Sequence, residues 1–124
     1  KLNNIKEIEV WGDGEQTRSF MYIEDCLIGS KKIFDSDLTD VYNLGSDEQV
    51  SINQLIDIIE NIANYKVKKK YLLDKPKGVR GRSSDNTKIN AELGWSPSIG
   101  LKQGLLKTYN WIDNQIKSNA RKQI

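Results

Sequence analysis

The chain has 124 residues, the size of a single domain, and 37% of them are hydrophobic and 29% charged. This apolar share can form a core and is too high for a disordered tail, while no apolar run reaches the roughly 18 residues of a membrane span. A net charge of +2 is too small to indicate nucleic acid binding. With no histidine and only Cys26 as a thiol, His/Cys zinc sites, Ser-His-Asp triads and Cys-His dyads are excluded.

The sequence opens on Lys1, and its only methionine is Met21, so we expect the chain to be part of a longer protein. Its first residues lack the apolar region of a signal peptide. One cysteine forms no intramolecular disulfide, which fits a reducing compartment, and we expect a cytoplasmic protein with no membrane partner. No composition shift divides residues 1–124, which we interpret as one domain.

The first segments of the chain are predicted to be strands. Ile8, Val10 and Trp11 form a short apolar run that stops at Gly12-Asp13-Gly14, and residues 17–23 alternate between two faces. Asp-Gly is typical of hairpin turns because glycine tolerates a positive φ. We therefore predict a two-stranded hairpin over residues 7–23.

Helical signals follow the hairpin. Acidic residues suit the first turn of a helix, so Glu24 and Asp25 predict a helix over 24–34, with Asp25 interpreted as its N-cap. A short strand is expected over 41–44. Ser51 and Gln54 have the spacing of a capping box, and the apolar residues behind them predict a helix over 52–63.

The second half alternates in the same way. We predict a strand over 66–73, a basic loop over 74–84, a helix over 85–93 with Asp85 as N-cap and Gly94 as its end, and a last helix over 100–118. The fold class is α/β (α+β), with one small sheet that contains the hairpin and about four helices. Composition and periodicity alone say nothing further of function.

Two groups of arginines are candidate anion ligands. Arg18 follows a tight turn on a strand, and its planar guanidinium matches two phosphate oxygens; the alternative is a solvated residue paired with Glu15 or Glu24. Arg80 and Arg82 flank Gly81 before a helix N-terminus, which favours anion binding, although a mobile basic loop has the same composition.

The lysines between residues 66 and 70 allow a nucleic acid patch or a protected strand edge. No aromatic residues alternate with them in the manner of nucleic acid binding domains, so we favour the edge and expect no nucleic acid partner. The carboxylates show no metal-ligand spacing, and no metal site is expected.

Three segments, WGDGEQTRSFMYIEDC, VYNLGSDEQVSINQL and GVRGRSSDNTKINAELGWSP, resemble the C-terminal part of extended short-chain dehydrogenases/reductases, the nucleotide-sugar epimerases and dehydratases. The similarity covers about residues 8–117. Within this family, the runs VRGRSSDN and WGDG…QTRSF are most similar to those of the GDP-mannose 3,5-epimerases.

The resemblance implies a two-part enzyme. Its N-terminal Rossmann domain binds NAD and carries a Tyr-x-x-x-Lys pair, and this chain is the C-terminal nucleotide-sugar-binding domain that closes over the substrate. The Gly-rich fingerprint is absent, and the only Tyr-x-x-x-Lys spacing, at Tyr65 and Lys69, opens a basic strand. We therefore expect no catalytic residue, no cofactor and no turnover in this chain alone, with its own Rossmann domain as partner and a homodimeric full-length enzyme.

The resemblance also assigns substrate-binding residues. Arg18 matches the arginine that reaches the nucleotide diphosphate, and either Arg80 or Arg82 matches a second one; the sequence does not decide between them. Asn43 matches the asparagine of the YNxG segment, and Gln16 is a weaker neighbour on the same turn as Arg18. The implied substrate is a GDP-sugar.

In such enzymes NAD transiently oxidises the sugar at C4, which acidifies the neighbouring C–H bonds so that C5 and C3 are inverted. The acid and base for these steps lie in the Rossmann domain. Two alternatives remain open: the same domain of another nucleotide-sugar 4-epimerase, 4,6-dehydratase or decarboxylase, or a stand-alone binding module without catalysis.

Overall fold

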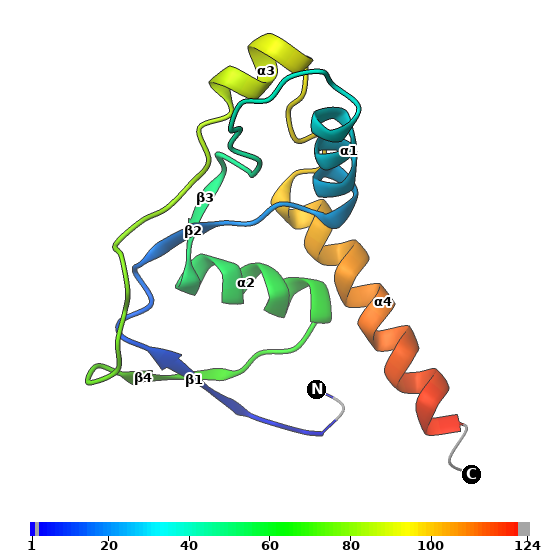
Figure 1. Ribbon diagram of the computed structural model, residues 1–124. Coiled ribbons are helices and arrows are strands. Elements are labelled where there is room, and N and C mark those ends of the chain that lie inside the picture. The colour runs from blue at the N-terminus through cyan, green and yellow to red at the C-terminus, as the bar shows by residue number, and fades with distance from the viewer. Residues whose placement is uncertain (2, 122–124) are drawn as a thin grey trace.

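A computed structural model describes residues 1 and 3–121 of the chain. In chain order the elements are β1 (Glu7–Trp11), β2 (Thr17–Ser19), α1 (Ile23–Phe34), β3 (Gln49–Ser51), α2 (Ile52–Ala63), β4 (Lys68–Leu72), α3 (Thr87–Leu93) and α4 (Leu101–Arg121). As Figure 1 shows, two short strand pairs lie on either side of α2, and α1 and α3 form a second group at the other end of the molecule. The mixed α/β class with four helices is thus confirmed for the described residues.

The strands pair across the sequence. β1 runs parallel to β4, with Glu7 opposite Lys68, and β2 runs antiparallel to β3, with Thr17 opposite Ser51. The predicted hairpin over 7–23 is therefore wrong, and the single small sheet expected to contain it is instead two separate two-stranded sheets. Gly12 and Gly14 do adopt positive φ values of 77° and 75°, but the turn connects two different sheets. The main-chain oxygen of Gly14 accepts a hydrogen bond from the Asn53 amide at 3.0 Å, and the Gly12 amide donates to the Leu72 oxygen at 2.8 Å, so the turn is held by α2 and β4.

The helix predictions agree closely with the structure. α2 has the predicted bounds and a complete capping box: the Gln54 amide donates to Ser51 Oγ at 3.1 Å, and the Ser51 amide donates to Gln54 Oε1 at 2.8 Å. Gly94 ends α3 in the left-handed conformation, with φ of 58°. α1 begins one residue earlier than predicted, and α4 extends to Arg121.

The strand predicted over 41–44 is not formed. Val41 is 83% exposed, and the segment is held by side chains that reach α3 and the residues before it. The Tyr42 hydroxyl donates to the Glu92 carboxylate, and Asn43 Nδ2 donates to the main-chain oxygen of Asp85 at 3.3 Å. The segment predicted to be a strand is therefore a loop, held by hydrogen bonds from its own side chains and not by a strand ladder.

Neither aspartate is the N-cap that the sequence indicated. Tyr22 takes the N-cap position of α1, and Asp25 is the third residue of the helix, in its first turn, and only 2% exposed. Asn86 takes the N-cap position of α3, and Asp85 lies one residue before it, where its Oδ1 accepts from the Thr87 amide at 3.0 Å. The sequence pattern correctly indicated that these carboxylates lie near the starts of helices. It did not indicate which hydrogen-bond donors they bind.

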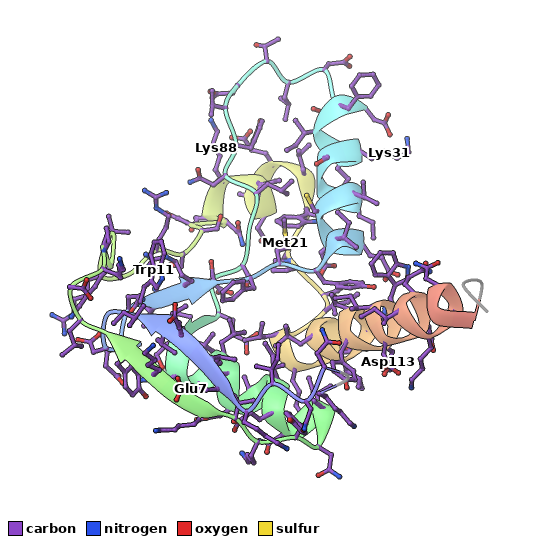
Figure 2. The ribbon with its side chains drawn as sticks, turned by 90° about the horizontal axis from the view of Figure 1, so that it is seen from below. Glu7, Trp11, Met21, Lys31, Lys88 and Asp113 are labelled. Atoms are coloured by element: carbon purple, nitrogen blue, oxygen red, sulfur yellow. The ribbon has the colours of Figure 1, made fainter. Side chains whose placement is uncertain are left out.

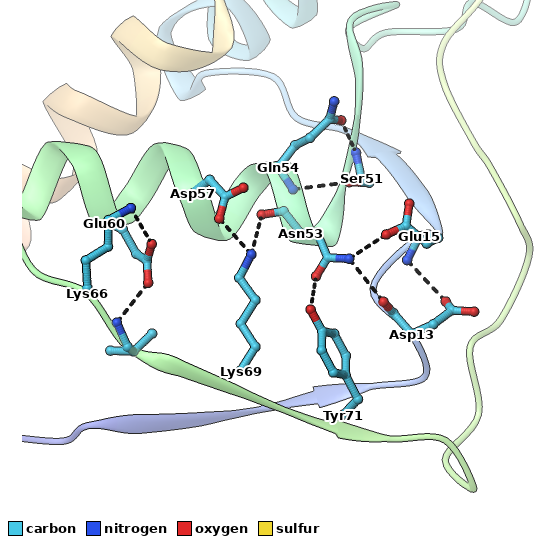
Figure 3. A network of polar contacts seen from close by, with 11 residues as sticks. Asp13, Glu15, Ser51, Asn53, Gln54, Asp57, Glu60, Lys66, Lys69 and Tyr71 are labelled. Carbon is cyan, nitrogen blue, oxygen red and sulfur yellow. Dashed lines mark hydrogen bonds and ion pairs between the residues drawn. The ribbon is translucent and has the colours of Figure 1, made fainter.

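The lysines of β4 are paired with carboxylates. Across the parallel pair, Lys70 Nζ lies 3.3 Å from Glu9 and Lys68 Nζ lies 3.7 Å from Glu7. On the α2 side, Lys69 Nζ lies 2.6 Å from Asp57; Figure 3 shows this contact beneath the helix. This run is therefore a set of ion pairs around a short sheet. Among helices of the described part, none has the length and apolar character needed to cross a membrane.

Candidate nucleotide-binding site

Residues 74–86, which we call the strap, connect β4 with α3 along one side of the molecule (Figure 1). The strap is bound at successive points: the Thr17 amide donates to the Arg80 oxygen at 2.8 Å, and the Ser84 amide donates to the Ser46 oxygen at 3.0 Å. Of the two interpretations of this basic segment, a mobile loop does not fit these contacts. The strap holds a defined course over β2 and β3.

A hollow of about 400 Å³ lies between the strap and the segment that follows α1. Met21, at the centre of Figure 2, forms part of its lining. The residues around the hollow are mostly small and polar: Ser19, Met21, Asn43, Leu44, Gly45, Ser46, Arg82, Ser83 and Ser84. None of them carries a carboxylate, so the lining is positively charged.

The structure brings Asn43 and Arg82 together at this hollow. Asn43 donates to the Asp85 oxygen at 3.3 Å, which ties its side chain to the end of the strap. Within residues 1 and 3–121, the Arg82 guanidinium has neither a hydrogen bond nor an ion pair, so its donors are free for a ligand. A guanidinium beside hydroxyl and amide donors is suited to an anion with several oxygens.

Arg18 lies next to the hollow rather than in it. Its Nη1 donates to the main-chain oxygens of Thr17 at 2.6 Å and Val79 at 2.9 Å, and its Nη2 donates to the Lys77 oxygen at 3.4 Å. The suggested pairing with Glu15 or Glu24 is wrong. In this structure Arg18 fastens the strap to β2, and its neighbour Ser19 lines the hollow.

Gln16 and Arg80 do not line the hollow. Gln16 Nε2 donates to the Trp11 oxygen at 3.0 Å, and its Oε1 is buried with no hydrogen-bond partner in the described part of the chain. The Arg80 main-chain oxygen accepts a hydrogen bond from the Thr17 amide of β2. Among the five candidates, only Asn43 and Arg82 therefore face one space.

The start of α3 does not add an anion site. The Thr87 hydroxyl and amide donate to Asp85, and these bonds hold the pKa of that carboxyl below its ordinary value. The Thr87 amide, the first of this short helix, is therefore already hydrogen-bonded and is not free for a ligand. Across residues 1 and 3–121, no cluster of three or more His, Cys, Asp or Glu side chains has metal-binding geometry.

A polar network fixes the turn that precedes Arg18 (Figure 3). Asn53 Nδ2 donates to the Asp13 oxygen at 3.0 Å and to Glu15 Oε1 at 2.6 Å, and Asn53 Oδ1 accepts from the Tyr71 hydroxyl at 3.0 Å. Asp13 in turn pairs with Lys77 of the strap at 2.7 Å, a contact that lowers the pKa of Asp13. The turn, α2, β4 and the strap are thus joined at one place.

Four serines of the lining, at positions 19, 46, 83 and 84, were not singled out from the sequence. Serine is common in surface loops, and these four come from three separate segments. Only the pairing of β2 with β3 and the course of the strap bring them together. The doublet Ser83-Ser84 after Arg82 was the one local signal.

Comparison with known proteins agrees with this fold. The family model of GDP-mannose 4,6 dehydratase matches residues 1–108. A GDP-mannose 3,5-epimerase of Oryza sativa is 46% identical over 109 residues, which cover 88% of this chain and 29% of that protein. The UDP-glucose 4-epimerase of Thermotoga maritima, solved with UDP-glucose, has a TM-score of 0.82 at 29% identity and covers 89% of this chain and 36% of that one.

A further solved relative is the UDP-glucuronic acid 4-epimerase of Bacillus cereus in complex with UDP-glucuronic acid and NAD. Its TM-score is 0.80 at 32% identity, again over 89% of this chain and 36% of that chain. These proteins are nucleotide-sugar epimerases with the Rossmann-type fold of extended short-chain dehydrogenases/reductases. The chain belongs to the GDP-mannose 4,6 dehydratase family, which confirms the resemblance seen in the sequence. It spans about a third of the length of the relatives it matches.

Proposed function

We propose that residues 1–124 are the nucleotide-sugar-binding domain of an NAD-dependent epimerase that acts on GDP-mannose at C3 and C5. The observation that carries the proposal is the hollow in which Arg82, with free donors, faces Asn43 and several serine hydroxyls. A diphosphate offers several negatively charged oxygens, and donors of this kind match them. The identity of 46% to a GDP-mannose 3,5-epimerase supports the choice of nucleotide and sugar.

In this account the chain binds and orients the substrate and performs no bond-breaking step. Arg82 and Asn43 hold the diphosphate end of the nucleotide-sugar, and Arg18 and the strap keep the hollow in shape. The dinucleotide site, the acid and the base belong to a Rossmann domain that the relatives' greater length accommodates. NAD supplies hydride transfer at C4 of the sugar when it is bound there. Holding the substrate in register with that site is how this domain contributes to rate.

The test uses the polypeptide as its gene encodes it. Incubated with NAD and GDP-mannose in D₂O, the enzyme should give a product with solvent deuterium at C3 and C5, measured by NMR. A product altered only at C4, or no product from GDP-mannose, would remove this substrate assignment.

A second candidate is a UDP-sugar 4-epimerase, favoured by the TM-scores of 0.80 and 0.82 to two such enzymes. The same reaction in D₂O, with UDP-glucose in place of GDP-mannose, distinguishes the two candidate functions. Inversion at C4 without deuterium at C3 or C5 would favour this candidate.

The near-neutral charge and the paired lysines of β4 support the view that nucleic acid is not a partner.

A further inference from the structure

The glycine between the two strap arginines lies unusually close to the strands beneath it. A Cβ atom at Gly81 would stand 2.7 Å from Thr17 Oγ1 and 3.2 Å from Gln49 Oε1. Gly81 has no positive φ, so its backbone conformation is open to any residue. The close approach, and not the backbone angle, is therefore what requires glycine here.

Gln49 connects the same two strands to the strap. Its Oε1 accepts from the Thr17 hydroxyl at 2.7 Å, and its Nε2 donates to Ser83 Oγ at 3.1 Å. Because both ends of the amide are engaged, its orientation is fixed. Ser83, which lines the hollow, is thereby tied to β2 through one side chain.

The other end of this part of the strap is also seated tightly. A Cβ atom at Gly45 would stand 2.7 Å from Ser84 Cβ, and the Ser84 amide donates to the Ser46 oxygen. Arg82 and Ser83 therefore lie between two fixed points. The position from which the Arg82 side chain enters the hollow depends on both.

Thr17 has little freedom to yield to a larger residue at position 81. Its amide holds the Arg80 oxygen at 2.8 Å, which fixes the distance between strand and strap. Rotation of its hydroxyl would break the bond to Gln49 and release Ser83. Either response moves the strap residues that line the hollow.

We propose that Gly81 and Gln49 are positioning residues, which set the height of Arg82 and Ser83 over the hollow so that both reach the diphosphate. The inference rests on the proposed function. Neither residue lines the hollow, so both act through their strap neighbours.

The test is Gly81→Ala in the polypeptide as its gene encodes it, titrated with GDP by calorimetry. We expect GDP to bind roughly tenfold more weakly, with a melting temperature within about 2 °C of wild type, because Gly81 is exposed. UDP affinity should fall by the same factor, since the change acts on phosphate contacts and not on the base.

Gly100→Ala is the matched control. A Cβ there would meet only Glu48 Oε2, at 3.9 Å, which is an ordinary contact, so GDP affinity should be unchanged. Thr17→Ala removes the hydroxyl that the new methyl group meets, but it also breaks the bond to Gln49 and should weaken GDP binding by itself. In the double variant Gly81→Ala/Thr17→Ala the two losses should be less than additive, because both changes release Gln49 and Ser83. Gln49→Met, similar in length but without either hydrogen bond, should weaken GDP binding in the same direction as Gly81→Ala.

The outcomes separate the two proposals. If wild type binds GDP and Gly81→Ala and Gln49→Met bind it equally well, the positioning role is overturned and the proposed function stands. If Gly81→Ala melts well below wild type and Gln49→Met binds GDP as wild type does, glycine serves the fold alone and the inference is again overturned. If wild type binds neither GDP nor UDP, the proposed function fails, and the positioning role fails with it.

Discussion

Asp25 and Ser98, far apart in the sequence, are joined by two hydrogen bonds to one oxygen atom: the Ser98 amide donates to Asp25 Oδ1 at 3.1 Å and its hydroxyl at 2.8 Å. The Ile99 amide donates to the other carboxylate oxygen at 2.9 Å. Asp25 thus fixes the loop that leads into α4 against the first turn of α1. The nearby Glu48 carboxylate accepts from the Leu101 amide at 2.9 Å and completes the attachment of α4.

This relationship predicts a pH-dependent contribution to stability. Burial raises the pKa of Asp25, but the hydrogen bonds from Ser98 and Ile99 outweigh it, so the pKa of Asp25 lies below its ordinary value. The contribution is therefore complete above the unfolded-state pKa of about 3.9 and is lost as pH falls through the lower folded-state pKa. Asp25→Asn should lower the free energy of unfolding by about 1.5–3 kcal/mol at pH 7, measured with urea.

The difference between wild type and Asp25→Asn should narrow as the urea titrations are repeated at pH values below about 4. Asp35→Asn, at the C-cap of the same helix, is the control, since its pair with Lys31 is exposed and contributes at most about 1 kcal/mol. A difference that stays constant down to pH 3 would contradict the assignment of the effect to the ionised carboxylate.

The capping box at the start of α2 predicts a stability effect without a binding effect. Ser51→Ala removes the acceptor of the Gln54 amide and should lower the free energy of unfolding by about 0.5–2 kcal/mol. GDP affinity should stay at the wild-type value, because Ser51 does not line the hollow. A loss of affinity without a loss of stability would show that Ser51 serves the site.

Asn53 should be more important to the fold than its position on a helix surface suggests. Asn53→Ala removes the side-chain bonds to Asp13, Glu15 and Tyr71, and we expect a loss of about 1–3 kcal/mol in thermal or urea unfolding. Asp57→Ala, one turn further along α2, breaks an ion pair whose carboxylate is half exposed. Lys69 keeps its hydrogen bond to the Asn53 main-chain oxygen at 3.2 Å, so the loss should be no more than about 1 kcal/mol. Equal losses in the two variants would contradict the view that Asn53 joins the turn to α2 and β4.

Arg18 should not be replaceable by lysine. Its two Nη atoms reach three main-chain oxygens, at Thr17, Val79 and Lys77, and an ammonium group on a flexible stem lacks that fixed fork. In Arg18→Lys, amide hydrogen exchange at Thr17 should accelerate as the strap loosens, and GDP affinity should fall by roughly tenfold. Wild-type exchange and affinity in this variant would mean that charge alone is required.

Features that depend on residues adjacent in the sequence were predicted correctly. The capping box at Ser51 and the apolar spacing behind it placed α2 correctly, and Gly94 marked the end of α3. The prediction failed where contacts with residues far along the chain determine the structure. The Gly12–Gly14 turn has the residues of a hairpin, yet its hydrogen bonds to Leu72 of β4 and Asn53 of α2 direct it from one sheet to the other.

The candidate site shows the same division. Arginine and asparagine were selected by residue type and by resemblance, but the choice between Arg80 and Arg82 depends on which side of the strap faces the hollow. That orientation is set by the contacts of Gly81 and Ser84 with other segments, which no local pattern records. The serines of the lining were missed for the same reason.

The central claim, that the hollow binds the diphosphate of a nucleotide-sugar through Arg82, is tested most directly by calorimetric titration with GDP and with guanosine. Arg82→Ala and Arg80→Ala are compared with wild type in the polypeptide as its gene encodes it. We predict that wild type binds GDP far more tightly than guanosine, that Arg82→Ala loses at least about tenfold in GDP affinity, and that Arg80→Ala stays within about threefold of wild type. Equal binding of GDP and guanosine, or an Arg82→Ala variant that binds GDP as wild type does, would contradict the account.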